Sequence, residues 1–155
     1  MPEGIATATG LVRAPADRVY ALLADYRYHH PRIVPPEYFT ELHVEQGGRG
    51  AGTRIRIRMR VLGVVREFIH LVREPEPGRV LEEVDTEGTT TTTFRVEPIE
   101  DGAGARVTIE TRFQVQPGIR GMIARALTAM LLRRIYHREL ARLDEYAQSR
   151  AAVAV

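Results

Sequence analysis

The chain contains no cysteine, lysine, asparagine or tryptophan, and its only serine is Ser149. The absence of cysteine excludes disulfides, thiolate metal ligands and cysteine nucleophiles. The absence of lysine excludes a Schiff-base lysine and a phosphate-binding P-loop lysine, and the lone serine near the end excludes a Ser-His-Asp triad. Proton transfer and nucleophilic attack are therefore left to histidine, aspartate, glutamate, tyrosine and threonine.

Long hydrophobic runs are also missing. No segment of about 18 consecutive apolar residues is present to span a membrane. Residues 1–4 lack the basic and apolar regions of a secretory signal, so we expect a cytoplasmic protein without a membrane span. All 22 basic residues are arginine, yet the net charge is only +2, which gives no strong field to attract polyanions.

Length and composition are those of an ordinary globular protein. The chain has 155 residues, of which 44% are apolar and 27% are charged. We expect one domain over residues 1–150 and a disordered tail at residues 151–155.

Most of the chain shows the patterns of β-strands. The clearest alternation covers residues 53–61, where Ile55, Ile57 and Met59 share one face and arginines the other. Turn residues separate the segments at regular intervals, and strands that follow one another without helices favour an antiparallel meander. The predicted strands are residues 5–13, 38–46, 53–61, 64–73, 80–87, 89–97 and 106–116.

Helical spacing appears in two places. Pro15 can open a short helix that ends near Ala24, and residues 26–36 form an irregular segment. Residues 118–148 carry a broad apolar face and predict a helix of roughly 45 Å. A sheet that curls around such a helix fits it imperfectly, so we expect a cavity between them.

Four segments, in this order and spacing, resemble the START-related (SRPBCC) superfamily of polyketide cyclases, lipid-transport and Bet v 1-like proteins. They are residues 12–20, 50–53, 72–81 and 138–143, and the likeness covers about residues 5–148. The resemblance implies an α+β helix-grip fold, in which a curved seven-stranded antiparallel sheet wraps around a long C-terminal helix. The superfamily includes carriers, cyclases and co-regulators, so fold transfers better than function.

Within this fold, we expect the cavity to be lined by inward-facing residues of the strands and the long helix. In the strand 64–73, Phe68, His70 and Val72 share the face that we expect to point inward, whereas residues 80–85 alternate too poorly to assign. A methionine stripe on the helix would suit an adaptable binding wall, although such a stripe is more often plain core. The candidate ligand-binding residues are His30, Tyr38, Ile55, Ile57, Met59, Phe68, His70, Thr92, Phe94, Thr111, Met122, Ala126 and Met130.

The histidines have ordinary structural interpretations beside the functional ones. His70 could hydrogen-bond a ligand carbonyl or shuttle a proton, or it could be a core histidine with a threonine or backbone partner. Of the adjacent His29 and His30, at most one is expected to face the cavity, and the pair could instead cap a turn and lie in solvent. A metal site would need a third ligand such as His43 or Glu41 at a spacing that is not usual, so no metal is expected.

Two further motifs suggest phosphate binding. The glycine-rich residues 48–52 resemble part of a dinucleotide loop, but a strand rather than a helix follows them, so we interpret them as a hairpin turn. Arg54, Arg56, Arg58 and Arg60 could follow a nucleic-acid backbone. They could also pair with glutamates of neighbouring strands on a solvated face, and we expect no nucleic-acid partner.

These observations favour binding of a hydrophobic or amphipathic small molecule, with transport or sequestration as possible purposes. The alternative is a polyketide aromatase/cyclase that needs a proton relay in the cavity. A protein-interaction or co-regulator module is a third class. No cofactor is implied, and the sequence leaves the catalytic residues, the ligand and the oligomeric state open.

Overall fold

The structure, a computed structural model, describes residues 2–153, with side chains to residue 150. It contains seven strands, two short helices, a single 3-10 turn and one long helix within that range. The elements are β1 (Glu3–Val12), α1 (Ala16–Ala24), α2 (His30–Ile33), β2 (Phe39–Gln46), β3 (Arg54–Val61), β4 (Val64–Glu76), β5 (Val80–Asp85), β6 (Thr90–Ile99), η1 (Glu100–Gly102), β7 (Gly104–Gln114) and α3 (Ile119–Val153).

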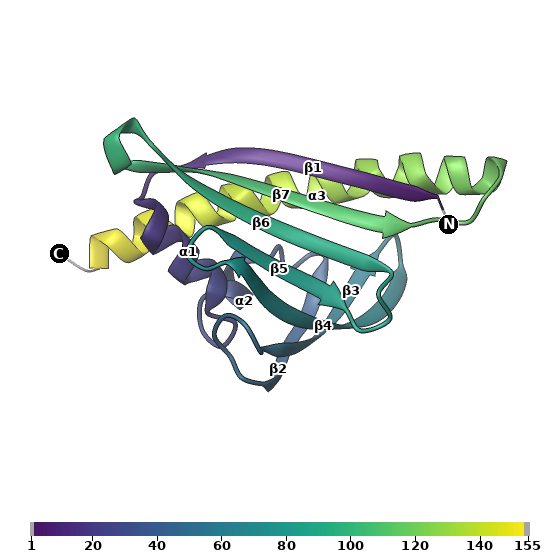
Figure 1. Cartoon of the computed structure of the whole chain (residues 1–155), viewed down its shortest axis with the longest axis horizontal. Helices are drawn as coiled ribbons and strands as arrows, with labels where there is room; N and C mark the ends of the chain where they lie inside the picture. Colours follow the sequence, from purple (N-terminus) through teal and green to yellow (C-terminus); the bar gives the residue numbers. More distant parts are fainter. Residues whose placement is uncertain (1, 154–155) are drawn as a thin grey trace.

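The seven strands form one antiparallel sheet in the order β1-β7-β6-β5-β4-β3-β2. The sheet curves around α3, and the short helices α1 and α2 close the end where the second half of α3 lies (Figure 1). This arrangement confirms the predicted α+β helix-grip fold. Helix α3 continues through residues 151–153, part of the segment for which the sequence predicts a disordered tail, and residues 154–155 lie outside the described residues.

The second half of α3 carries the helix side of the core. Ile135, Leu140 and Leu143 are buried there at helical spacing and pack with inner-face residues of the sheet such as Phe94 and Val96. The first turns of α3 project past the sheet instead (Figure 1). Most of their apolar side chains are therefore exposed to solvent.

The structure of β5 explains why the inner face of this strand could not be assigned from its sequence. Leu81, Glu83 and Asp85 share the inner face and are all buried, while Glu82 and Val84 are only half-buried. Two carboxylates therefore occupy core positions of a strand. Alternation of hydrophobicity fails there although alternation of burial is regular.

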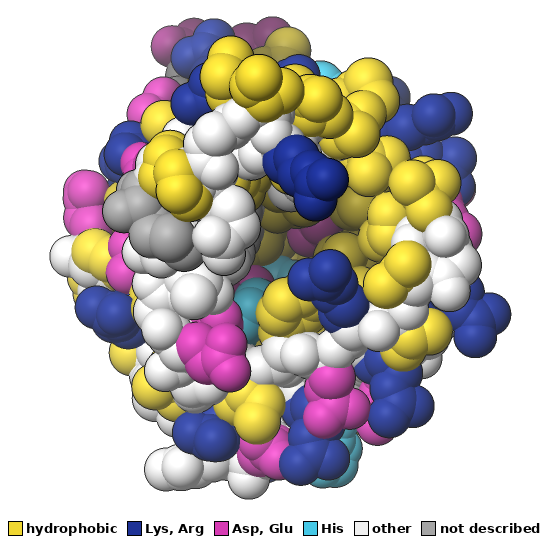
Figure 2. Space-filling view, turned by 90° about the vertical axis from the view of Figure 1, so that its right-hand side faces the viewer, with side chains coloured by type: hydrophobic (Ala, Val, Ile, Leu, Met, Phe, Trp, Pro, Cys, Tyr) yellow, Lys and Arg dark blue, Asp and Glu magenta, His cyan; other side chains and the backbone are white. Residues whose placement is uncertain are grey.

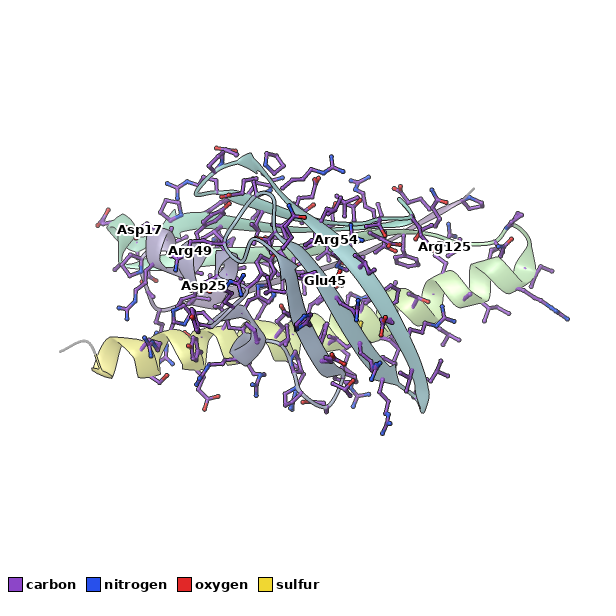
Figure 3. The ribbon with its side chains drawn as sticks, turned by 90° about the horizontal axis from the view of Figure 1, so that it is seen from below. Asp17, Asp25, Glu45, Arg49, Arg54 and Arg125 are labelled. Carbon is purple, nitrogen blue, oxygen red and sulfur yellow. The ribbon has the colours of Figure 1, made fainter. Side chains whose placement is uncertain are left out.

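The arginine row of β3 lies on the outer face of the sheet. Arg54 Nε lies 3.2 Å from Glu45 Oε1, and Arg56 Nη2 lies 2.6 Å from Glu45 Oε2 (Figure 3). Arg58 Nη2 lies 3.2 Å from Glu67 Oε2 on β4. Cross-strand pairing thus accounts for three of the four arginines, as expected for a solvated sheet face.

The glycine-rich loop between β2 and β3 forms a turn, as expected, and it packs against α1. Arg49 Nη2 in this loop lies 3.1 Å from Asp25 Oδ2 at the end of α1 (Figure 3). Asp25 also accepts hydrogen bonds from the backbone N–H groups of Arg27 and Tyr28. This buried aspartate therefore holds the chain where it leaves α1.

Candidate functional site

A pocket of about 160 Å³ lies between the inner face of the sheet and α3. Its walls are mostly apolar, and its polar groups are the side chains of His70, Tyr136 and four threonines. We call it the inner pocket. Its lining residues are Phe39, Ile57, Met59, Phe68, His70, Thr90, Thr92, Thr111, Phe113, Thr128, Leu132 and Tyr136.

A second pocket of about 370 Å³, the outer pocket, adjoins the first. The two share Met59 and Phe68 from the sheet and Thr128 and Leu132 from α3. The outer pocket is also lined by residues of the β3–β4 hairpin and by Leu131. Figure 2 shows the resulting hollow, with a histidine inside it and hydrophobic and arginine side chains around it.

Three hydroxyl groups form a hydrogen-bonded row at the polar wall. The Oγ1 atoms of Thr92 and Thr111 lie 2.8 Å apart, and Thr111 Oγ1 also hydrogen-bonds the phenol of Tyr136. All three side chains are buried. Burial raises the pKa of Tyr136 well above its ordinary value, so the phenol stays protonated and can donate.

His70 stands at the junction of this wall with a buried carboxylate. Its Nδ1 lies 3.4 Å from Glu83 Oε2 but has no partner in hydrogen-bond geometry within the described residues. The ring lies beside Phe68, with 6.0 Å between ring centroids. His70 thus contacts the pocket and Glu83 at the same time.

Behind His70, Glu83 belongs to a cluster of buried titratable groups. The hydroxyl of Tyr26 donates to Glu83 Oε1 over 2.8 Å. His30 Nε2 lies 3.8 Å from Glu83 Oε1 and 3.9 Å from Glu139 Oε1. His30 Nδ1 donates to the carbonyl of Leu23 over 2.7 Å, since a carbonyl can only accept.

The two carboxyl groups of the cluster have opposite pKa shifts. Burial alone would raise the pKa of Glu83, but the contact with His70, the nearby charge of His30 and the Tyr26 hydroxyl together lower it. For Glu139, burial and the negative charge of Glu83 raise the pKa to about 8. At neutral pH, Glu83 is ionised and Glu139 carries a proton.

Some sequence-predicted site residues line the inner pocket and others do not. Ile57, Met59, Phe68, His70, Thr92 and Thr111 line it. Ile55 and Phe94 are core residues outside the lining, and His30 is buried behind the pocket with its ring stacked on Tyr26. Tyr38 is half-buried, and its neighbour Phe39 lines the pocket in its place.

The prediction that Met122, Ala126 and Met130 form the helix-side wall is wrong. All three are exposed, and the wall is formed by Thr128, Leu132 and Tyr136. The helix is apolar on more than one face in its first turns, so spacing alone did not show which face packs on the sheet. His29 also lies outside the pocket: its Nδ1 hydrogen-bonds the hydroxyl of Tyr146 over 2.7 Å, and burial lowers its pKa.

Sequence analysis missed Glu83, Glu139, Tyr26 and Tyr136. A signal was present for two of them. Glu83 lies two residues after Leu81 and so shares its face, and Glu139 lies between Tyr136 and Leu143 in the buried helix stripe. Both were passed over because a charged residue is rarely buried. Within residues 2–153, no group of three or more histidines and carboxylates is arranged so that it could hold a metal ion.

The fold and the site define a helix-grip protein with a pocket between the sheet and the long helix, and sequence comparison identifies the family. Residues 5–148 match the sequence model of the polyketide cyclase / dehydrase and lipid transport family. The chain belongs to this family, which confirms the resemblance to the START-related superfamily. No curated protein sequence matches the chain significantly.

Solved structures show the same fold. The solution structure of KanY protein is similar with 25% identity and a TM-score of 0.82, over 96% of this chain and 99% of that one. A START superfamily protein from Mycobacterium smegmatis has 15% identity and a TM-score of 0.72, over 92% and 98%. The Zhui aromatase/cyclase from Streptomyces sp. R1128 has 18% identity and a TM-score of 0.74, over 97% and 96%.

Proposed function

We propose that residues 1–150 form one domain that binds a small amphipathic molecule in the inner pocket, with its polar group against the threonine–tyrosine wall. The observation that carries this proposal is the asymmetry of the pocket. The hydroxyls of Thr92, Thr111 and Tyr136 form a hydrogen-bonded row beside His70, Thr90 and Thr128 are the other polar lining residues, and the remaining walls are apolar. Apolar walls provide affinity, and a few polar groups fix orientation.

The outer pocket indicates how the ligand would be oriented. Its lining is apolar except for Arg66 and Thr128, and it shares lining residues with the inner pocket. A ligand whose polar group reaches Tyr136 would therefore leave its apolar part in the outer pocket. Phenols, quinones and hydroxylated or keto-substituted hydrocarbons meet this description.

The first experiment is native mass spectrometry of the purified protein, followed by extraction with organic solvent. We expect a small molecule that is released on denaturation. Because it could be lost in purification, 2-naphthol titrated into the protein provides a defined probe. Absence of both a copurified ligand and saturable 2-naphthol binding would contradict the proposal.

Removing polar groups from the wall should weaken binding of the probe. We expect Thr92→Val and Tyr136→Phe each to raise the Kd of 2-naphthol by about fivefold to tenfold, because each removes a hydrogen-bonding group from the wall. Thr108→Val is the matched control, since Thr108 pairs with Thr9 on the outer face. Isothermal titration calorimetry measures all three; equal Kd values would place the probe elsewhere.

A second function, catalysis of the aromatase/cyclase type, is favoured by one observation. The ring of His70 faces the pocket and has the ionised Glu83 behind it, at 3.4 Å. In such a pair, the carboxylate orients the imidazole and stabilises its protonated form. His70 could then take a proton from carbon next to a ketone and return it to oxygen during cyclisation.

This function predicts a strong dependence on His70. With a poly-β-keto substrate, His70→Gln should lower kcat by at least about a hundredfold while the circular dichroism spectrum stays unchanged. His43→Gln, on the exposed part of β2, should leave kcat unchanged. Full turnover by the His70 variant would remove this residue from the mechanism.

A further inference from the structure

Most of the exposed large hydrophobic residues that the structure describes lie on two elements, the β3–β4 hairpin and the first turns of α3, and residues of both elements line the outer pocket. Leu62 at the tip of the β3–β4 hairpin is 84% exposed, and Ile119 at the start of α3 is 76% exposed. We call this set the apolar rim. It consists of Leu62, Val64, Val65, Ile119, Met122, Ile123, Leu127 and Met130.

The rim comes from two elements that lie on either side of the same opening. Leu62 and Val64 of the hairpin and Thr128 and Leu131 of α3 together line the outer pocket. In Figure 2, hydrophobic side chains border the hollow, with arginines among them. Exposed apolar patches of this kind mark interaction surfaces, since solvent exposure of so many large side chains is unfavourable.

The charged side chains on the two elements that carry the rim are mostly arginines. Residues 119–136, the first five turns of α3, contain four arginines and no aspartate or glutamate. Arg60 and Arg66 of the hairpin and Arg120 and Arg125 of α3 have no ion-pair partner within the described residues, unlike the arginines earlier in β3. Arg125 lies at this end of the molecule (Figure 3). The rim is therefore a hydrophobic surface bordered by uncompensated positive charge.

We propose that the apolar rim docks onto the surface of an anionic lipid bilayer, with the mouth of the outer pocket facing the lipid. Apolar side chains at the tips of the hairpin and helix enter the boundary between headgroups and acyl chains, and the arginines bind lipid phosphates. The docking is peripheral, because no helix within residues 2–153 has the length and hydropathy to cross a membrane. Membrane docking needs no ligand in the pocket, so it can be tested independently of the proposed function.

A lipid surface fits the rim better than a second copy of the chain. In a two-fold symmetric dimer the same patch contacts itself, which would bring the arginines of one copy toward those of the other. Like charges at an interface oppose association. Anionic headgroups supply the opposite charge together with an apolar interior.

Vesicle flotation with the full chain tests the proposal. We compare vesicles of phosphatidylcholine alone with vesicles that also contain about 30% phosphatidylglycerol, in low and in about 0.5 M salt. Binding to the anionic vesicles should be at least about tenfold stronger than to the neutral ones, and salt should weaken it. No binding to anionic vesicles at low salt, or equal binding to both kinds, would overturn the proposal.

Four substitutions test the rim and the arginines that border it, and two further substitutions elsewhere on the surface are the matched controls. Leu62→Glu, Ile123→Glu, Arg66→Glu and Arg120→Glu should each weaken vesicle binding by about tenfold or more. Leu11 and Arg106 are an exposed cross-strand pair at the opposite end of the sheet, so Leu11→Glu and Arg106→Glu should leave binding unchanged. All six positions are on the surface, so the fold should be retained.

Sedimentation velocity of the wild type and the same variants distinguishes the alternative occupant. A monomer that binds anionic vesicles through the rim supports the proposal. A dimer that dissociates on Leu62→Glu or Ile123→Glu would assign the rim to a second copy and overturn it. Equal vesicle binding by the rim variants and the controls would overturn it as well.

Discussion

Replacing Glu139 by glutamine is expected to stabilise the protein at alkaline pH, by about 4–5 kcal/mol near pH 8. Burial and the charge of Glu83 raise the pKa of Glu139 from 4.5 to about 8 in the folded state. A raised folded-state pKa stabilises fully below the unfolded value, and that contribution is lost as the pH rises through the folded value. Glutamine keeps the shape of the protonated carboxyl group and has no proton to lose.

The pH dependence distinguishes this effect from an ordinary change in packing. Urea denaturation across the pH range should show equal stability of Glu139→Gln and wild type near about pH 4, and a gap that grows by about 1.4 kcal/mol per unit until about pH 8. Glu145→Gln, on the exposed face of the same helix, should follow the wild type throughout. A constant gap at all pH values would show that the folded and unfolded states hold the Glu139 proton equally.

The second large effect is expected from Glu83→Ala, which should lower the free energy of unfolding at pH 7 by about 3–5 kcal/mol. The substitution removes the acceptor of the Tyr26 hydroxyl and the carboxylate beside His70. It leaves these buried polar groups without their partner, and that loss is larger than the net value of the interactions themselves. The depressed pKa of Glu83 means that its stabilising contribution is present above about 4.5 and is lost as the pH falls below that value.

Glu82→Ala is the matched control, because Glu82 is the neighbour of Glu83 that faces the outside of β5. Its contact with Arg73 is 3.9 Å long, so its removal should cost less than about 1 kcal/mol. If Glu83→Ala does not fold, Tyr26→Phe tests the same hydrogen bond at an expected cost of about 1–2 kcal/mol. Equal stabilities of the Glu83 and Glu82 variants would mean that the buried cluster contributes no net stability.

The two predictions describe one arrangement of protons. A single negative charge is held on Glu83 beside His70, and the second carboxyl group, on Glu139, remains neutral. A site of this kind keeps a buried histidine next to a fixed negative charge. The same arrangement would orient His70 toward a bound ligand or assist proton transfer.

Alternation and turn residues predicted nearly the whole sheet. The segment 53–61 corresponds to β3 (Arg54–Val61), and its inward residues Ile55 and Ile57 are buried as expected. Local signals succeed there because one face of an antiparallel strand is buried and the other is solvated, so the pattern records the geometry. The predicted facing of Phe68 and His70 holds for the same reason.

The sequence pattern of α3 did not predict which face of the helix packs on the sheet. Met122, Ala126 and Met130 belong to an apolar stripe that is exposed to solvent, whereas Thr128 and Tyr136 face the pocket. Periodicity identifies an apolar stripe but not its partner, since the rotation of a helix is set by the surface it packs against. The exposure of this stripe became visible only once the length of the sheet under α3 was known.

By itself, the sequence determined the order of the strands and helices, the inner and outer faces of most strands and the family to which the chain belongs. Only the tertiary structure decided which face of α3 lines the pocket and which charged residues are buried. Glu83, Glu139, His30 and Tyr26 come from four separate elements or loops, and their meeting depends on how the sheet curves around the helix. Hydrophobic patterning acts over a few residues of chain, whereas a buried charge is stabilised by partners that are close only in the folded protein.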